Sequence, residues 1–348
     1  MVGKQTKEID RYKHRVLELD LPLTSNVDPY KLRKELGVPD YVDLGYFPMQ
    51  RAVVVFHAAR HANEFSDEKG IVSERPIDVT VFGGAAFKFH CPSCNEGYLK
   101  RDVHDVDFVI KSGYGRKFIR LLTLLGSVYG SRYTHYEQCP EDVEFNSMGR
   151  AWRYRVRAIN SIEEDGSGIF GEVDIICDKI KLRHAMDFTE TLKHPQENLY
   201  TVGLVGMIIS KCQVIDMAKK DQLIGSGEGW RVLPYDLIPG YAVIGMERKD
   251  LKDIYALFND HELGEGPEEI DVKKLSKILG DKKLRKTVRL NLEFAAESVD
   301  REQFADMGEP YKSRISERIK ELLGKLPEST EKWSSPWWET AVETPRGL

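Results

Sequence analysis

Apolar positions along the chain follow two different periods. Between residues 77 and 180, short runs such as "VTVF", "DFVI" and "GEVDIIC" alternate with polar residues and turn signals, and this period of two predicts strands. The segment 114–130, "YGRKFIRLLTLLGSVYG", is instead apolar at helical spacing. Residues 1–75 and 195–325 also follow mainly the helical period, as in "MQRAVVVFHAARHANEF" and "YKSRISERIKELLGKL". The pattern predicts an α/β (α+β) core with helical regions on either side of it in sequence.

The same pattern predicts the division of the chain. We expect a mainly helical N-terminal region at 1–75, a core with a mixed sheet at 76–190, a helical C-terminal domain at 191–326, and a tail at 327–348. The tail is polar but carries three tryptophans, in "KWSSPWWET". Because clustered tryptophans usually make contacts, we expect the tail to dock its indole rings.

Composition narrows the class of protein. Of the 348 residues, 41% are hydrophobic and 31% charged, which is typical of a soluble globular protein. No apolar run approaches the roughly 18 residues of a membrane span, and the N-terminus lacks the apolar core of a signal peptide. Five cysteines favour a reducing cytoplasm over a disulfide scaffold, and a net charge of −5 argues against generic nucleic-acid binding.

The stretch 104–110, "HDVDFVI", contains the first candidate chemistry. Alternation along a strand places Asp105 and Asp107 on one face, and His104 with the apolar residues on the other, in the core. Two like charges on one face repel, and aspartate is depleted in strands. A divalent cation such as Mg²⁺ would compensate for both effects, because it prefers carboxylate oxygens and substrate phosphates. The alternative is a solvated sheet edge.

A pair of glycines lies upstream of these acids. Gly83 and Gly84 follow the strand "VTVF" and precede "AAFKFH", which favours a helix. A strand, a glycine turn and a helix start form a candidate anion site, because glycine lets a phosphate approach the backbone closely. A plain tight turn is the alternative, and the spacing of a P-loop is absent.

A third carboxylate is expected from the segment 151–180. Its two arms, joined by "EEDGSG", predict a hairpin. On the second arm Asp174 lies between apolar residues, as Asp107 does, so the hairpin would bring it beside Asp105 and Asp107. A polar outer face, to which Glu172 also belongs, is the alternative.

This order of motifs resembles the polymerase-beta-like nucleotidyltransferase superfamily, over roughly residues 77–260. In the C-terminal half, Lys211 in "NLYTVGLVGMIISKC" and Asp250 (or Asp253) in "ERKDLKDIYALF" resemble the toxin-like abortive-infection nucleotidyltransferases. The resemblance implies that the three acids hold two Mg²⁺ ions and that the glycine turn holds the nucleoside triphosphate. It also implies that Lys211 contacts the triphosphate and that Asp250 supports it.

The expected function is therefore transfer of a nucleoside monophosphate from a triphosphate to an acceptor hydroxyl, with release of pyrophosphate. The acceptor could be a tRNA 3′ end, a protein or a small molecule, and the toxin-like resemblance favours tRNA. Basic runs such as "WRYRVR" at 152–157 would attract phosphate, or would simply solvate a strand face. The rival interpretation is a non-catalytic module of the same fold that binds a nucleotide or a partner.

One further motif stays open. "HCPSC" offers His90, Cys91 and Cys94, and its one CxxC is half of a zinc site. His104 and Cys139 are candidate partners, and no second CxxC exists. Structural zinc, a redox pair and unliganded thiols are the three alternatives.

Overall fold

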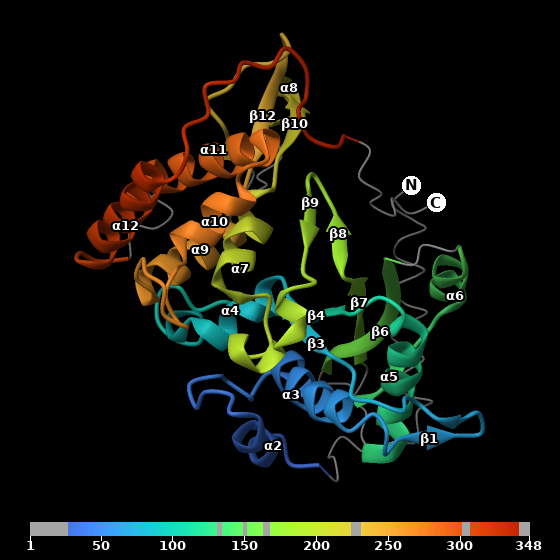
Figure 1. Cartoon of the computed structure of the whole chain (residues 1–348). Helices are drawn as coiled ribbons and strands as arrows, with labels where there is room; N and C mark the ends of the chain where they lie inside the picture. The colour runs from blue at the N-terminus through green and yellow to red at the C-terminus, as the bar shows by residue number, and fades with distance from the viewer. Residues whose placement is uncertain are drawn as a thin grey trace. The chain divides into compact units, whose positions relative to one another are not determined.

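The computed structural model describes residues 27–130, 134–148, 152–162, 168–223, 231–300 and 307–340 (Figure 1). Contacts divide the chain into two compact units. Unit 1 comprises Met1–Phe89, Asp102–Ile180 and Asp187–Val202, and unit 2 comprises His90–Arg101, Lys181–Met186 and Gly203–Leu348. Both contain helices and strands, so the mixed α/β class predicted from the sequence is confirmed.

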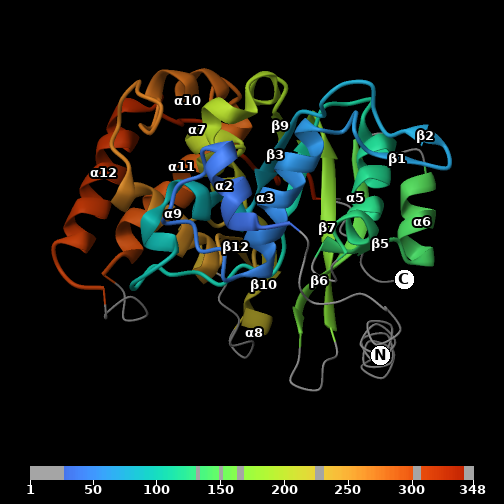
Figure 2. The same ribbon diagram turned by 90° about the horizontal axis from the view of Figure 1, so that it is seen from below.

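A five-stranded mixed sheet forms the centre of unit 1. Its strands, in spatial order, are β3 (Val79–Phe82), β4 (Asp107–Ile110), β7 (Gly168–Cys177), β6 (Arg153–Ile162) and β5 (Tyr136–Glu137). The β4–β7 pair is parallel, and the other three pairs are antiparallel. Strands β6 and β7 are the two arms of the predicted hairpin and run side by side in Figure 2. Its expected turn lies outside the described residues.

Helices α3 (Phe47–Arg60) and α5 (Gly115–Tyr129) pack against the sheet and against each other. Both helices were predicted from their apolar spacing. Gly115 begins α5 where a Cβ atom would lie 2.1 Å from the ring of Tyr154 on β6, so only glycine fits this contact. Since side chains alternate along β6, Tyr154 faces α5, and Arg153 and Arg155 project from the other face of the sheet.

Strand β4 is buried, as expected for a strand that has neighbours on both sides. Phe108, Val109 and Ile110 of β4 have no exposed surface. One prediction for this segment is wrong. His104 is exposed, because the strand begins only at Asp107 and the preceding residues are irregular, so alternation does not extend back to position 104.

Short elements complete unit 1. They are α2 (Pro29–Leu36), β1 (Ser66–Asp67), β2 (Gly70–Ile71), α4 (Gly84–His90), α6 (Pro140–Ser147), β8 (Lys179–Lys181), β9 (Ala185–Asp187), η4 (Thr191–Lys193) and η5 (Pro195–Asn198); α4, β8 and β9 extend to or across a unit boundary. Helix α2 begins with the Asp28 side chain accepting a hydrogen bond from the backbone N–H of Tyr30 and with proline in the first turn.

Helices form most of unit 2. They are η2 (Pro92–Cys94), α7 (Gly203–Cys212), α8 (Lys220–Leu223), α9 (Arg248–Asp260), α10 (Val272–Ile278), α11 (Lys282–Ser298) and α12 (Tyr311–Lys325). A small antiparallel sheet accompanies them, with β12 (Tyr241–Gly245) between β10 (Asp216–Lys219) and β11 (Arg231–Val232). The sequence pattern predicted a mostly helical region here, interrupted by a loop rich in glycine and proline at 224–240. The three strands were not predicted: they are short, and they lie in that loop or close to it.

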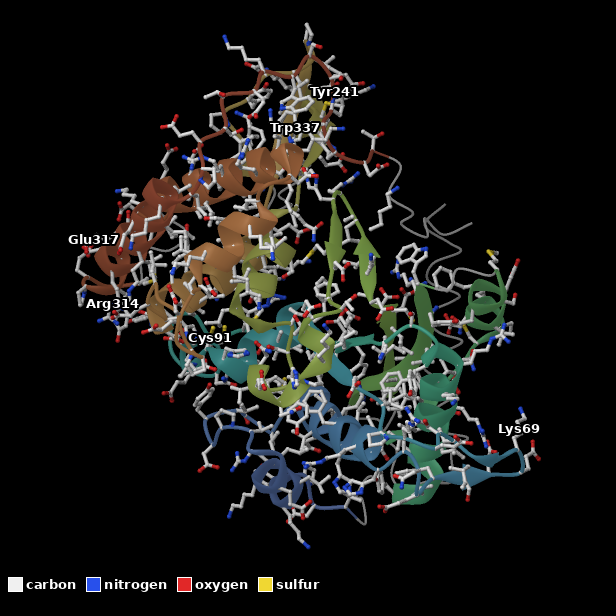
Figure 3. The ribbon with its side chains drawn as sticks, viewed as in Figure 1. Lys69, Cys91, Tyr241, Arg314, Glu317 and Trp337 are labelled. Atoms are coloured by element: carbon white, nitrogen blue, oxygen red, sulfur yellow. The ribbon has the colours of Figure 1, made fainter. Side chains whose placement is uncertain are left out.

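The tryptophan tail docks within unit 2. Trp337 and Trp338 are buried, and the indole N–H of Trp337 donates to Oγ1 of Thr287 on α11 at 2.9 Å. Trp337 is labelled beside α11 in Figure 3. This confirms the expectation that the tail packs its indole rings. Within the described residues, no helix is both long and apolar enough to cross a membrane.

Candidate active site at one end of the five-stranded sheet

Antiparallel pairing of β3 with β4 brings the glycine turn to the first acid of the strand. Phe82, the last residue of β3, lies opposite Asp107, the first residue of β4. Gly83 follows directly with a φ of 72°, a left-handed conformation that favours glycine. A Cβ atom built at Gly83 would lie 3.6 Å from Oδ2 of Asp107. The absence of a side chain there leaves the approach to this carboxylate open.

Parallel pairing of β4 with β7 adds Asp174. Phe108 lies opposite Ile175, so the residues preceding them, Asp107 and Asp174, begin the shared part of the two strands. The backbone N–H of Asp174 donates to Oδ1 of Asp107 at 3.1 Å. Residues 83, 107 and 174 are therefore neighbours in unit 1, although the chain separates them widely.

Asp105 lies just before β4 and is exposed. The strand geometry that the sequence predicted for it is absent, but its charge still acts on Asp107. Burial raises the pKa of Asp107 well above its usual range, and the negative charges of Asp174 and Asp105 raise it further. The site therefore favours a proton, or another cation, on Asp107.

Two arginines hold the third carboxylate. On Asp174, Oδ1 accepts from Nε of Arg153 at 3.1 Å and from Nε of Arg155 at 3.4 Å, and Oδ2 accepts from Nη2 of Arg153. Sequence reasoning missed these pairs. A signal was present in "RYRVR", since every second residue there is an arginine, but only the register of the hairpin shows which acids lie opposite.

The ion pairs continue along the same face. Arg155 and Arg157 both contact Glu172 at 3.0 Å, and Arg157 also contacts the buried carboxylate of Asp142 on α6 at 2.9 Å. Three arginines thus face three carboxylates. The alternative for "WRYRVR", arginines that solvate a strand face, does not describe this arrangement, because the three side chains are ion-paired and only 7–17% exposed. Attraction of phosphate stays a prediction.

The donor set suits a hard divalent cation. Asp107 and Asp174 present carboxylates from adjacent strands, and Mg²⁺ is usually held by one or two carboxylates together with substrate phosphates. No group of three or more metal-ligating side chains is positioned to hold an ion in the part of the chain that the structure describes. Arg153 and Arg155 also donate to the two oxygens of Asp174, so a cation would have to displace at least one of them.

The remaining predicted residues belong to unit 2. Nζ of Lys211 on α7 donates to Oδ1 of Asp250 at 2.8 Å and lies 2.9 Å from Oδ2 of Asp253, both on α9. Arg101 is the second cation, with Nη1 2.7 Å from Asp253. Burial lowers the pKa of Lys211, but the carboxylates of Asp253 and Asp250 outweigh it and raise that pKa above its usual value. The four charges form a balanced buried cluster.

The two cysteines of the CxxC motif are buried free thiols. Sγ of Cys91, labelled in Figure 3, lies 3.8 Å from Nε2 of His261, which the sequence did not point to as a partner. Burial and the neighbouring thiol of Cys94 raise the pKa of Cys91 well above its usual value. Of the expected zinc partners, Cys139 donates to Asp142 in unit 1, and His104 is exposed. Zinc binding remains untested.

Comparisons with known proteins add no family. No protein-family model matches the chain, and neither curated proteins nor solved structures gave a match.

Proposed function

We propose that the protein is a metal-dependent nucleotidyltransferase. It would transfer a nucleoside monophosphate from a nucleoside triphosphate to an acceptor hydroxyl and release pyrophosphate. The observation that supports this is the meeting of a glycine turn and two carboxylates at one end of the sheet: Gly83 lies beside Oδ2 of Asp107, and the N–H of Asp174 donates to Oδ1 of the same carboxyl at 3.1 Å. Such a site suits an anion that is bound together with a cation.

Asp107 and Asp174 would hold Mg²⁺, and the exposed Asp105 would contribute to a second ion. The cations would stabilise the entering and leaving oxygens at the α-phosphate. Asp107 is suited to this role, because burial and the negative charges of Asp174 and Asp105 both disfavour its bare carboxylate and so favour a bound cation. A bound cation would offset the repulsion that now raises its pKa.

The glycine turn would position the triphosphate. Gly83 and Gly84 place no side-chain atoms beyond the backbone next to Asp107, so phosphate oxygens could approach both the main chain and the carboxylate. Positioning of this kind accounts for much of the catalysis in phosphoryl transfer. Roles for Lys211 and Asp250 in triphosphate binding are part of the proposal through the motif resemblance.

One observation favours the rival function, a non-catalytic module that binds a nucleotide or another partner. Arg153 and Arg155 neutralise Asp174 within the protein itself. A carboxylate held in this way serves equally well as a structural ion pair. The two functions differ in one measurable outcome, which is whether a covalent product forms.

The test is incubation with each nucleoside triphosphate labelled at the α-phosphate, together with Mg²⁺ and either bulk tRNA, the protein alone or a small-molecule extract. We expect α-label, but not γ-label, to become attached to one acceptor. Asp107→Asn should abolish the transfer. Asp78→Asn is the matched control, because Asp78 is also a half-buried aspartate whose pKa burial raises, but it precedes β3, at the opposite end of that strand from Gly83. Binding of triphosphate without any labelled product would favour the rival module.

A further inference from the structure

The arginines of β6 differ in how many acidic partners they have. Arg155 contacts both Asp174 and Glu172, and Arg157 contacts both Glu172 and Asp142. Among the described residues, Arg153, at the end of the row, forms an ion pair with Asp174 alone, and the other acid on which its charge acts, Asp107, would hold the same cation. If Asp174 gave its oxygens to a cation, Arg155 and Arg157 would therefore keep a carboxylate, whereas Arg153 would lose its anionic partner.

Arg153 cannot remain unpaired without cost. Its side chain is only 14% exposed, and its guanidinium lies over the ring of Phe145, 5.8 Å from the centroid. A charge that is largely removed from water requires a hydrogen-bonding partner of opposite sign. An anion brought in with the cation would supply one.

Charge balance leads to the same conclusion. Arg153, Arg155 and Arg157 are balanced by Asp174, Glu172 and Asp142, and Asp107 adds a fourth carboxylate beside them. The two positive charges of a divalent cation on Asp107 and Asp174 would exceed the single negative charge that Asp107 adds, so the region would carry one excess positive charge. Phosphate is suited to restoring the balance, because its oxygens match the two parallel N–H groups that a guanidinium presents.

We infer that Arg153 is a positioning residue that changes partner: it holds Asp174 before the cation binds and holds a phosphate of the triphosphate afterwards. This inference depends on the proposed function, since it assumes that Asp174 binds the cation. It implies that Arg153 competes with the cation for Asp174 and assists the triphosphate. Its removal therefore has opposite effects on the two affinities, which a purely structural ion pair does not produce.

The test measures two affinities by titration calorimetry, using Mn²⁺ alone and then a triphosphate with a non-hydrolysable α–β bridge in saturating Mn²⁺. Arg153→Met keeps the apolar stem of the side chain and removes the fork. We expect it to bind Mn²⁺ about tenfold more tightly and the analogue about tenfold more weakly, as for loss of a charge-assisted hydrogen bond. Arg153→Lys, which retains a charge without the fork, should give smaller changes of the same signs.

Arg120→Met is the matched control. Arg120 pairs with Asp67 in unit 1, and the side chains of that pair are 22% and 20% exposed, compared with 14% and 22% for Arg153 and Asp174. It should leave both affinities unchanged. Suppose that the wild type binds both ligands and that both Arg153 variants leave the two affinities unchanged or reduce them equally. That result would overturn the partner exchange and leave the proposed function standing. A wild type that binds no Mn²⁺ would overturn both.

Discussion

Replacing Lys211 with methionine would remove one of the two cations from the buried four-charge cluster of unit 2. The ammonium lies 2.8 Å from Asp250 and 2.9 Å from Asp253, whose side chains are 7% and 0% exposed. After the substitution, Arg101 would still hold Asp253 at 2.7 Å. Within the described part of the chain, Asp250 would keep one hydrogen bond, from the backbone N–H of Glu247 at 3.2 Å, and the more distant charge of Lys249.

The expected loss of stability is large. Removing one partner of a buried ion pair costs about 3–5 kcal/mol, because the other charge stays desolvated and uncompensated. Since Asp250 keeps a backbone hydrogen bond at the start of α9, we expect the lower end, about 3 kcal/mol. Lys220→Met is the control. Lys220 pairs with Asp236 on the surface, with side chains 54% and 84% exposed, so its loss should stay within about 0.5 kcal/mol.

Urea unfolding followed by tryptophan fluorescence suits the measurement. Trp333, Trp337 and Trp338 all belong to unit 2, so the signal reports mainly on that unit. Circular dichroism should be recorded in parallel, because two units need not unfold in one step. The double variant Lys211→Met with Asp250→Asn should lose at least about 1 kcal/mol less than the sum of the single variants, since it restores the charge balance.

A loss below about 1 kcal/mol for Lys211→Met, equal to that of Lys220→Met, would refute this reasoning. It would mean that water reaches Asp250, or that a proton replaces the ammonium. A variant that is still folded would then show directly whether Lys211 contributes to triphosphate binding.

Three further outcomes are expected. Burial lowers the pKa of His184 to about 4, below its ordinary 6.5, so the neutral form stabilises the fold above pH 6.5. As the pH falls from 6.5 towards 4, up to about 3 kcal/mol should be lost, and urea unfolding of His184→Gln should show a flatter pH profile. Gly83→Ala and Gly113→Ala both force alanine to a positive φ, so each should lower the free energy of unfolding by about 1–2 kcal/mol. Only Gly83→Ala adds an atom 3.6 Å from Asp107, so only this variant should weaken Mn²⁺ binding in calorimetry. The melting temperature of Asp107→Asn should stay within about 2 °C of the wild-type value in a thermal scan, because the amide resembles the protonated carboxyl that burial favours. A marked drop would show that this acid has a structural role.

Local patterns in the sequence were enough to predict most elements that carry the site. Alternation around Asp107 and Asp174 predicted two strands, glycine after "VTVF" predicted the turn, and the helical period predicted α3, α5 and the long C-terminal helices. These elements follow from short-range spacing of apolar residues, which any stretch of chain displays by itself. The meeting of Asp107 and Asp174 was predicted as well, from strand alternation and the expected hairpin, and the motif resemblance implied the same grouping.

Pairing across the chain was decided only by the tertiary structure. Which acid faces Arg153 depends on the register of β6 and β7, and a shift of one residue would turn these side chains to the other face. The contact of His261 with Cys91 joins residues 170 positions apart, and no local pattern encodes it. Alternation predicted a core position for His104, yet the strand starts three residues later. A sequence therefore determines which faces are apolar and where turns fall, whereas ion pairs and buried polar contacts depend on which distant segments meet.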